Sequence, residues 1–192
     1  MHLNEVTVVR WIVLGSFSFL IFVAYDINQI RENRRALRVL FPAGIALLAL
    51  SSVKTAALDA SFPGLRLTSA IWLAGSAVSA WLLIYSLFFA IPAHEAYVEG
   101  SAQKLCTTGV YGACRHPGVW GFAGVYFFLA LFLGSRDLMT GGAVFTLCNI
   151  GYSWFQDELV FPKVFDDYSD YRNSVRFLIP AGKKEQDRIR RK

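Results

Sequence analysis

The chain has 192 residues, of which 55% are hydrophobic and 17% charged, and its formal net charge is +5. Its mean hydropathy of +0.41 exceeds what an ordinary soluble domain of this length can bury in one core. Composition therefore argues against a soluble globular protein and favours an integral membrane bundle. Nucleic acid is not expected as a partner, because the basic residues lie beside apolar segments and suit anionic membrane lipids.

Five apolar runs approach the ~20 residues that a helix needs to cross a bilayer. They cover residues 6–25, 42–58, 68–91, 117–134 and 138–155. The first run follows an acidic start and lacks a small-residue cleavage pattern, so we expect a membrane anchor and not a signal peptide that is removed. Lys54, in the second run, is expected either to reach the membrane interface or to face the protein interior.

The distribution of basic residues predicts the orientation of this bundle. The connection after the first run holds four arginines, which are Arg31, Arg34, Arg35 and Arg38. The C-terminal tail is also strongly basic, whereas the connections around Arg66 and Arg136 carry one basic residue each. Because Lys and Arg concentrate in cytoplasmic connections, we expect the N-terminus outside and the C-terminus in the cytoplasm.

The sequence thus predicts one all-α membrane domain over residues 1–192, with about five transmembrane helices and a cytoplasmic C-terminal helix. Residues 1–91 would form packing helices, residues 92–180 would carry the chemistry, and residues 181–192 would form the basic tail. The C-terminal helix is expected after the last run, where Phe161, Phe165 and Tyr168 recur at roughly helical spacing.

Two polar clusters lie at the ends of apolar runs, both on the predicted cytoplasmic side. In the first, Arg115 and His116 precede Pro117, a residue that suits the first turn of a helix. The second is the acidic pair Asp157-Glu158. Polar groups at the ends of membrane helices are costly there and usually mark a site.

Together the two clusters have the groups to bind a zwitterion. Arg115 and the free amides of a helix N-terminus would hold its carboxylate, and the acidic pair would hold its amine. The aromatic rings of Tyr111, Trp120 and Trp154 could face a sulfonium or another soft cation. The residues alone leave a plainer alternative open, in which His116 is a hydrogen-bonded interfacial histidine and the acidic pair ends a helix in solvent.

The three cysteines predict neither a disulfide framework nor a metal site. Cys106 and Cys114 lie on the predicted cytoplasmic side, where disulfides are rare. Their spacing to His116 matches no common zinc pattern, so no metal is expected.

The order of motifs over residues 103–180 resembles that of isoprenylcysteine carboxyl methyltransferases and their bacterial relatives, which are often grouped with phospholipid methyltransferases. The pattern is T-x-G-x-Y-x-x-x-R-H-P-x-x-x-G, two helices, an acidic pair, and a Y-x-x-Y segment ending in I-P. The matching residues are Thr107, Gly109, Tyr111, Arg115, His116, Pro117, Gly121, Asp157, Glu158, Tyr168, Tyr171, Ile179 and Pro180.

The resemblance implies that S-adenosylmethionine binds in a cytoplasmic pocket and that a lipophilic acceptor enters from the bilayer. It implies cofactor contacts at Gln103, Lys104, Leu105, Cys106, Tyr111, His116, Pro117, Gly118, Val119, Gly121, Asp157 and Glu158. Arg115, His116 and Glu158 are the expected catalytic residues. Ser153 stands where prenylcysteine enzymes place an arginine for the substrate carboxylate, so the acceptor is left open. The alternatives are a small thiol, an amine or a phospholipid headgroup as acceptor, or a catalytically silent membrane protein for sensing or assembly.

Overall fold

The computed structural model describes residues 2–61, 64, 66–89 and 107–180, and their regular structure is entirely helical. The long helices are α1 (His2–Arg31), α2 (Leu40–Ala56), α3 (Leu67–Ile84), α5 (Pro117–Leu133) and α6 (Arg136–Phe155). The short elements are η1 (Arg35–Val39), η2 (Tyr85–Phe89), α4 (Val110–Ala113), η3 (Gln156–Val160), α7 (Phe161–Val164) and α8 (Tyr168–Ser174). Each predicted apolar run coincides with a long helix, which confirms the all-α prediction.

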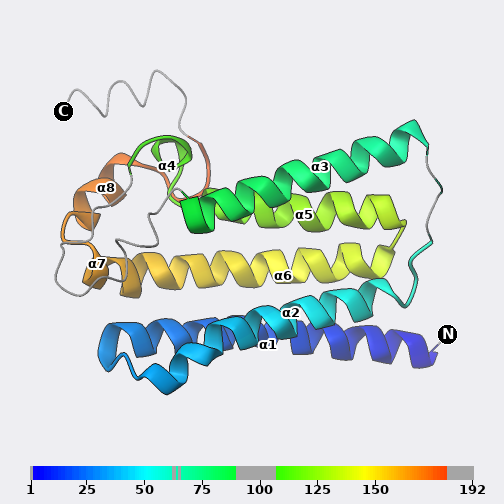
Figure 1. Ribbon diagram of the computed structural model, residues 1–192, viewed down its shortest axis with the longest axis horizontal. Helices are drawn as coiled ribbons and strands as arrows, with labels where there is room; N and C mark the ends of the chain where they lie inside the picture. The colour runs from blue at the N-terminus through cyan, green and yellow to red at the C-terminus, as the bar shows by residue number, and fades with distance from the viewer. Residues whose placement is uncertain (1, 62–63, 65, 90–106, 181–192) are drawn as a thin grey trace.

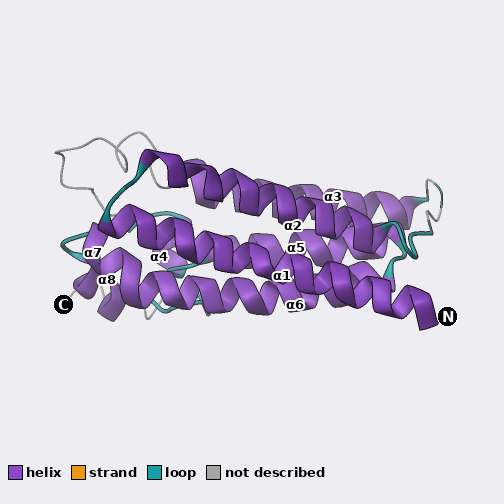
Figure 2. Ribbon diagram, turned by 90° about the horizontal axis from the view of Figure 1, so that it is seen from below, coloured by secondary structure: helices purple, strands orange, loops and turns teal. Residues whose placement is uncertain are grey.

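The five long helices run antiparallel along the long axis of the molecule (Figures 1 and 2). α5 and α6 lie in the middle; α3 packs on α5, and α1 and α2 pack on α6. The α1–α2 turn, the start of α5 and the elements after α6 therefore share one end of the bundle, which we call the site end. The N-terminus and the α2–α3 and α5–α6 connections lie at the opposite end, which we call the far end.

Within the part of the chain that the structure describes, three stretches are long and apolar enough to cross a membrane, judged by length and composition. They are Glu5–Arg31, Arg35–Ala56 and Leu67–Leu87, and α5 is a shorter apolar helix of 17 residues. Large apolar side chains such as Val53, Val78 and Trp81 lie exposed on α2 and α3. Lys54 is exposed in the last turn of α2, which corresponds to the first of the two placements expected for it. These features support embedding in a membrane.

Glycines allow aromatic side chains and helix backbones to approach closely inside the bundle. Phe145 of α6 is fully buried, and its ring lies where a β-carbon on Gly15 of α1 would stand. Gly121 of α5 lies against the backbone of α3. A β-carbon there would be 2.6 Å from the Leu83 nitrogen and 2.9 Å from the Ser79 carbonyl oxygen. Small residues at such contacts suit helix packing in lipid, where close approach replaces the hydrophobic effect.

At the far end, Asp59 fastens the chain after α2 to the start of α6. Its carboxylate accepts hydrogen bonds from the backbone N–H groups of Arg136 (2.7 Å) and Asp137 (3.0 Å), and from the Ser135 hydroxyl. The Ser135 hydroxyl oxygen accepts from the Leu138 N–H at 3.0 Å. The backbone N–H groups in the first turn of a helix have no partner within that helix. In α6, Asp59 and Ser135 supply acceptors for three of them, and Asp59 comes from the distant segment after α2.

The prediction of a single amphipathic helix after the last apolar run is wrong. Two short helices, α7 and α8, are separated by residues 165–167, where Phe165 has an extended backbone (φ −122°, ψ 119°). Asp166 and Asp167 follow it, and aspartate side chains compete with the helical backbone for hydrogen bonds. The regular aromatic spacing instead builds one cluster, in which the ring of Phe161 lies 5.9 Å from that of Phe165 and 5.4 Å from that of Tyr168.

The close α3–α5 contact predicts a strong dependence on Gly121. Gly121→Ala places a methyl group against backbone atoms that cannot rotate away, so we expect the free energy of unfolding to fall by about 1–3 kcal/mol. Gly151→Ala on α6 is the matched control, because no atom lies within 4 Å of its added β-carbon. That variant should be neutral or more stable by up to about 1 kcal/mol. Thermal unfolding in detergent micelles measures both, and equal behaviour of the two variants would contradict the packing described.

Candidate functional site

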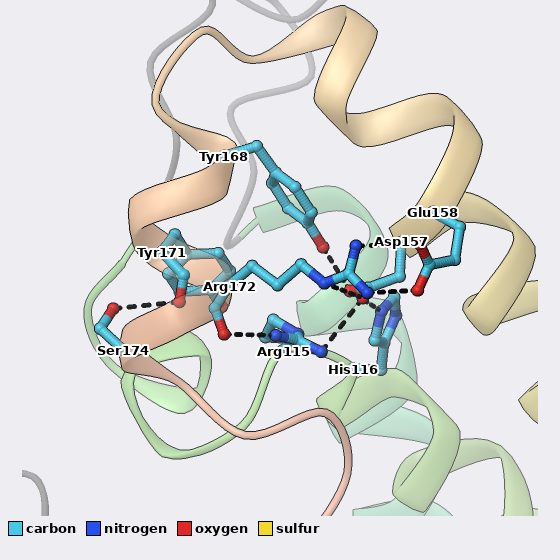
Figure 3. Close-up of polar contacts among 8 residues, drawn as sticks. All are labelled: Arg115, His116, Asp157, Glu158, Tyr168, Tyr171, Arg172 and Ser174. Atoms are coloured by element: carbon cyan, nitrogen blue, oxygen red, sulfur yellow. Dashed lines mark hydrogen bonds and ion pairs between the residues drawn. The ribbon is translucent and has the colours of Figure 1, made fainter.

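The carboxylate of Asp157, in η3, is the centre of a buried polar cluster at the site end (Figure 3). Its Oδ2 lies 3.0 Å from Nη2 of Arg115 and 3.6 Å from Nε of Arg172. Its Oδ1 lies 3.2 Å from Nε2 of His116 and accepts a hydrogen bond from the hydroxyl of Tyr168. Only 1% of the Asp157 side chain is exposed, so a buried charge is compensated by groups from two other segments, the residues before α5 and α8.

Arg115 and His116 reach this cluster because they immediately precede α5. His116 is the N-cap residue and Pro117 occupies the first turn, which confirms the predicted helix start. The backbone N–H groups of Arg115 and His116 donate to the carbonyls of Arg176 (2.9 Å) and Phe177 (3.2 Å). The segment after α8 is thereby held against the start of α5.

The His116 ring is held by aromatic contacts as well as by Asp157. It stacks on Phe161 of α7 at a centroid distance of 5.9 Å and meets the edge of Phe177 at 4.8 Å. Trp120, one turn into α5, donates from its indole nitrogen to the Leu178 carbonyl at 2.8 Å. The segment containing Phe177 and Leu178 therefore covers one side of the histidine and fixes its orientation.

Arg115 contacts α8, η3 and the segment after α8, and its contacts to the first two are drawn in Figure 3. Its Nη1 donates to the Arg172 carbonyl at 2.6 Å, its Nη2 pairs with Asp157, and its guanidinium lies 5.8 Å above the ring centre of Phe177. Its Nε is buried and has no hydrogen-bond partner among the described residues. A buried donor without a partner is costly, so this nitrogen has hydrogen-bonding capacity that the described protein groups leave unused.

Glu158 differs from its neighbour in both partner and exposure. Its two carboxylate oxygens accept from the guanidinium of Arg172, at 3.0 Å for the Nη1–Oε2 contact and more closely for Nη2–Oε1. About a third of each side chain is exposed, 33% for Glu158 and 37% for Arg172. This ion pair can therefore exchange partners, whereas the Asp157 carboxylate is enclosed.

Tyr111 of α4 ties two further segments to the cluster. Its hydroxyl donates to the Ser86 carbonyl in η2 (2.7 Å), and its own carbonyl accepts from the hydroxyl of Tyr171 on α8 (2.8 Å). The elements η2, α4 and α8 are thus joined beside the Asp157 cluster.

The surroundings of Asp157 favour its ionised form. Burial alone would raise its pKa, but hydrogen bonds from His116 and Tyr168 and the positive charge of Arg115 outweigh that effect and hold the pKa below its ordinary value. Burial, and then the hydrogen bond to Asp157, raise the pKa of the Tyr168 hydroxyl far above neutrality. Tyr168 therefore stays a proton donor wherever the protein is folded.

The structure brings together three of the predicted site residues, Arg115, His116 and Asp157, and places Glu158 beside them through Arg172. Pro117 and Val119 are buried in the first turn of α5, and Gly118 and Gly121 face α3. Tyr111 lies in α4, as described above, and the four other predicted positions lie outside the described residues; they are Gln103, Lys104, Leu105 and Cys106.

Sequence reasoning missed two contributors to the cluster, Tyr168 as a donor to Asp157 and Arg172 as the partner of Glu158. The Y-x-x-Y pattern marked the tyrosine as a motif position but gave it no role at the site. Arg172 lies four residues after Tyr168, so both project from the same face of α8. An arginine on that face, opposite in charge to the acidic pair, was the available signal.

Comparison of the chain with models of known families, with curated proteins and with solved structures finds no match. Family membership and methyl transfer therefore stay predictions from the motifs. The contacts around Asp157 are the structural ground on which a function can be proposed.

Asp157 and Glu158 are expected to differ sharply in their effect on stability. Asp157→Asn leaves Arg115 with an uncompensated buried charge, so the free energy of unfolding should fall by about 3–5 kcal/mol. Glu158→Gln removes a partly exposed pair and should cost less than about 1 kcal/mol. Thermal unfolding of both variants in the same detergent tests this difference. Equal losses would show that Asp157 does not hold the segments together.

The lowered pKa of Asp157 predicts a loss of stability in acid. Because the folded-state pKa lies below the ordinary value of 3.8, the carboxylate stabilises the fold fully above that value. This contribution disappears as the pH falls through the folded-state pKa. Unfolding measured from about pH 5 down to below the folded-state pKa should show a steeper acid loss for the native chain than for Asp157→Asn. Parallel pH profiles would contradict the assignment.

Proposed function

We propose that this protein is an integral membrane methyltransferase that uses S-adenosylmethionine and acts on a lipophilic acceptor at the cytoplasmic face. The observation that carries the proposal is the direct contact between two motifs 41 residues apart, His116 before α5 and Asp157 after α6. The same two motifs, in the same order, support the resemblance to isoprenylcysteine carboxyl methyltransferases.

The proposal includes five membrane crossings with the site end in the cytoplasm. α5 and α6 lie parallel or antiparallel to the three helices that have membrane length and composition, so a bilayer that contains those three would also contain α5 and α6. The four arginines of the α1–α2 turn lie at the site end, together with the Asp157 cluster. Positive residues prefer the cytoplasmic side, which favours this orientation.

The residues present fit the charged parts of this cofactor. The unpartnered Nε of Arg115 and the N-terminus of α5 suit its carboxylate. Glu158 suits its amine, because the carboxylate is partly exposed and can exchange the Arg172 guanidinium for another cation. Asp157 is fully occupied by protein donors, so we assign it a positioning role toward Arg115 and His116 and not a direct contact with the amine.

When bound by Arg115 and Glu158, S-adenosylmethionine would supply an electrophilic methyl group on a sulfonium, whose sulfur would keep the bonding pair when the methyl group passes to the acceptor. The chain contributes orientation and the exclusion of water, and orientation alone can supply ~7–11 kcal/mol of the barrier. Asp157 holds Nε2 of His116, so we assign its Nδ1 to receive the proton that an O–H, N–H or S–H acceptor releases.

A catalytically silent membrane protein is the second candidate, and one observation favours it. Arg115, His116, Asp157, Glu158 and Arg172 all have partners within the protein, as residues that only fasten the site end would. In that case the cluster would serve assembly or sensing. Cofactor binding distinguishes the two candidates directly.

Calorimetry with S-adenosylhomocysteine on the purified full chain in detergent is the test. We expect binding, and we expect Glu158→Gln to weaken it roughly tenfold or more, because a charged hydrogen bond is worth ~1.5–3 kcal/mol. His116→Ala should weaken it too. Glu5→Gln is the matched control, since it makes the same chemical change at an exposed position in the first turn of α1.

Absence of binding to folded native protein would favour the silent candidate, and equal weakening by Glu5→Gln would remove Glu158 from the site. If binding holds, transfer of a radiolabelled methyl group to extracted membrane lipids, compared with soluble thiols and amines, identifies the acceptor class.

A further inference from the structure

The turn between α1 and α2 is a second organised polar feature at the site end, and the proposed chemistry does not use it. Asn28 is buried and holds the turn: its Oδ1 accepts from the Arg34 N–H at 3.0 Å, and its Nδ2 donates to the Arg34 carbonyl at 3.3 Å. Its own carbonyl accepts from the N–H of Asn33, which has a positive φ of 45°. A left-handed residue and a buried asparagine define a fixed conformation here.

This fixed turn presents arginines around a hollow. The hollow measures about 220 Å³ and is lined by Ile27, Asn28, Arg31, Glu32, Arg34 and Leu37. Arg34 pairs with Glu32, and Arg38 donates from Nε and Nη2 to the Asn33 side chain at 3.3 and 3.1 Å. Arg31 is exposed at the end of α1. Glu32 is the one acidic residue among the four arginines of this turn, which are Arg31, Arg34, Arg35 and Arg38.

The hollow also has apolar walls and stands where apolar helices end. Ile27 and Leu37 are 36% and 38% exposed, and the neighbouring Val39 is 62% exposed. The stretch of membrane length in α1 ends at Arg31, and the next one begins at Arg35. A ligand that suits this place has an anionic head for the arginines and hydrocarbon for the adjoining side chains.

We propose that the α1–α2 turn binds the phosphate headgroup of an anionic phospholipid, with the hollow between Arg31 and Arg34 as its site. Guanidinium groups match phosphate oxygens in geometry and charge, and the apolar walls accept the start of the acyl chains. The site rests on the membrane insertion proposed above but does not depend on methyl transfer.

The test uses the purified full chain in detergent, titrated with dioleoyl-phosphatidylglycerol or dioleoyl-phosphatidylcholine and followed by native mass spectrometry. The two lipids share their acyl chains, so a difference reports the headgroup. Native protein should prefer phosphatidylglycerol. A basic residue near an anionic surface is worth roughly fivefold in affinity, so Arg31→Gln with Arg34→Gln should weaken its binding about 25-fold.

Two further variants make the result interpretable. Arg10→Gln with Arg136→Gln removes the same charge from exposed positions toward the far end and should leave the preference unchanged. Arg31→Lys with Arg34→Lys keeps the charge but not the guanidinium geometry, so it should weaken binding less than the glutamine pair, which controls for folding.

Three outcomes would overturn the proposal. They are equal binding of the two lipids, equal losses in the two glutamine double variants, and displacement of the lipid by glycerol phosphate at similar concentration, which would indicate a site for free anions. S-adenosylhomocysteine binding, measured on the same samples, reports the proposed function separately, so failure of either proposal is distinguishable from failure of the other.

Discussion

The site end of this protein depends on one buried charge, the carboxylate of Asp157. It receives donors from Arg115, His116 and Tyr168, which come from the start of α5 and from α8. A charge taken out of water requires compensation, and here the compensating groups bring three parts of the chain to one point. The same requirement fixes the orientation of the Arg115 guanidinium and of the His116 ring.

The two adjacent acidic residues, Asp157 and Glu158, differ in exposure because of the local backbone geometry. They lie in η3, a π-helical continuation of α6 in which the turn is wider than that of an α-helix. Asp157 is enclosed and Glu158 is partly exposed, with Arg172 alongside both. A site that must hold its own shape and also accept a charged ligand needs one group of each kind. This is why the proposed function gives positioning to Asp157 and recognition to Glu158.

The sequence was sufficient for the parts of the structure that follow from local chemistry. Apolar runs of membrane length predicted the five long helices, and Pro117 predicted the start of α5 within one residue. The contact between the two polar clusters also followed, because both were expected on the same side. The break between α7 and α8 did not follow, since the aromatic spacing fits a helix as well as it fits the cluster that forms. Arg172 shares a face of α8 with Tyr168, so its charge was a usable signal, but its position beside Glu158 depends on where that break places α8.

The carboxylate of Asp59 has a consequence for how the protein is made. The first turn of α6 carries backbone donors that its own segment does not satisfy, and Asp59, which follows α2, supplies the acceptor. During synthesis the N-terminal hairpin of α1 and α2 leaves the ribosome first, so this acceptor already exists when α6 emerges. The start of α6 therefore depends on a residue that follows α2 for two of its backbone hydrogen bonds, which couples the folding of the two halves of the chain.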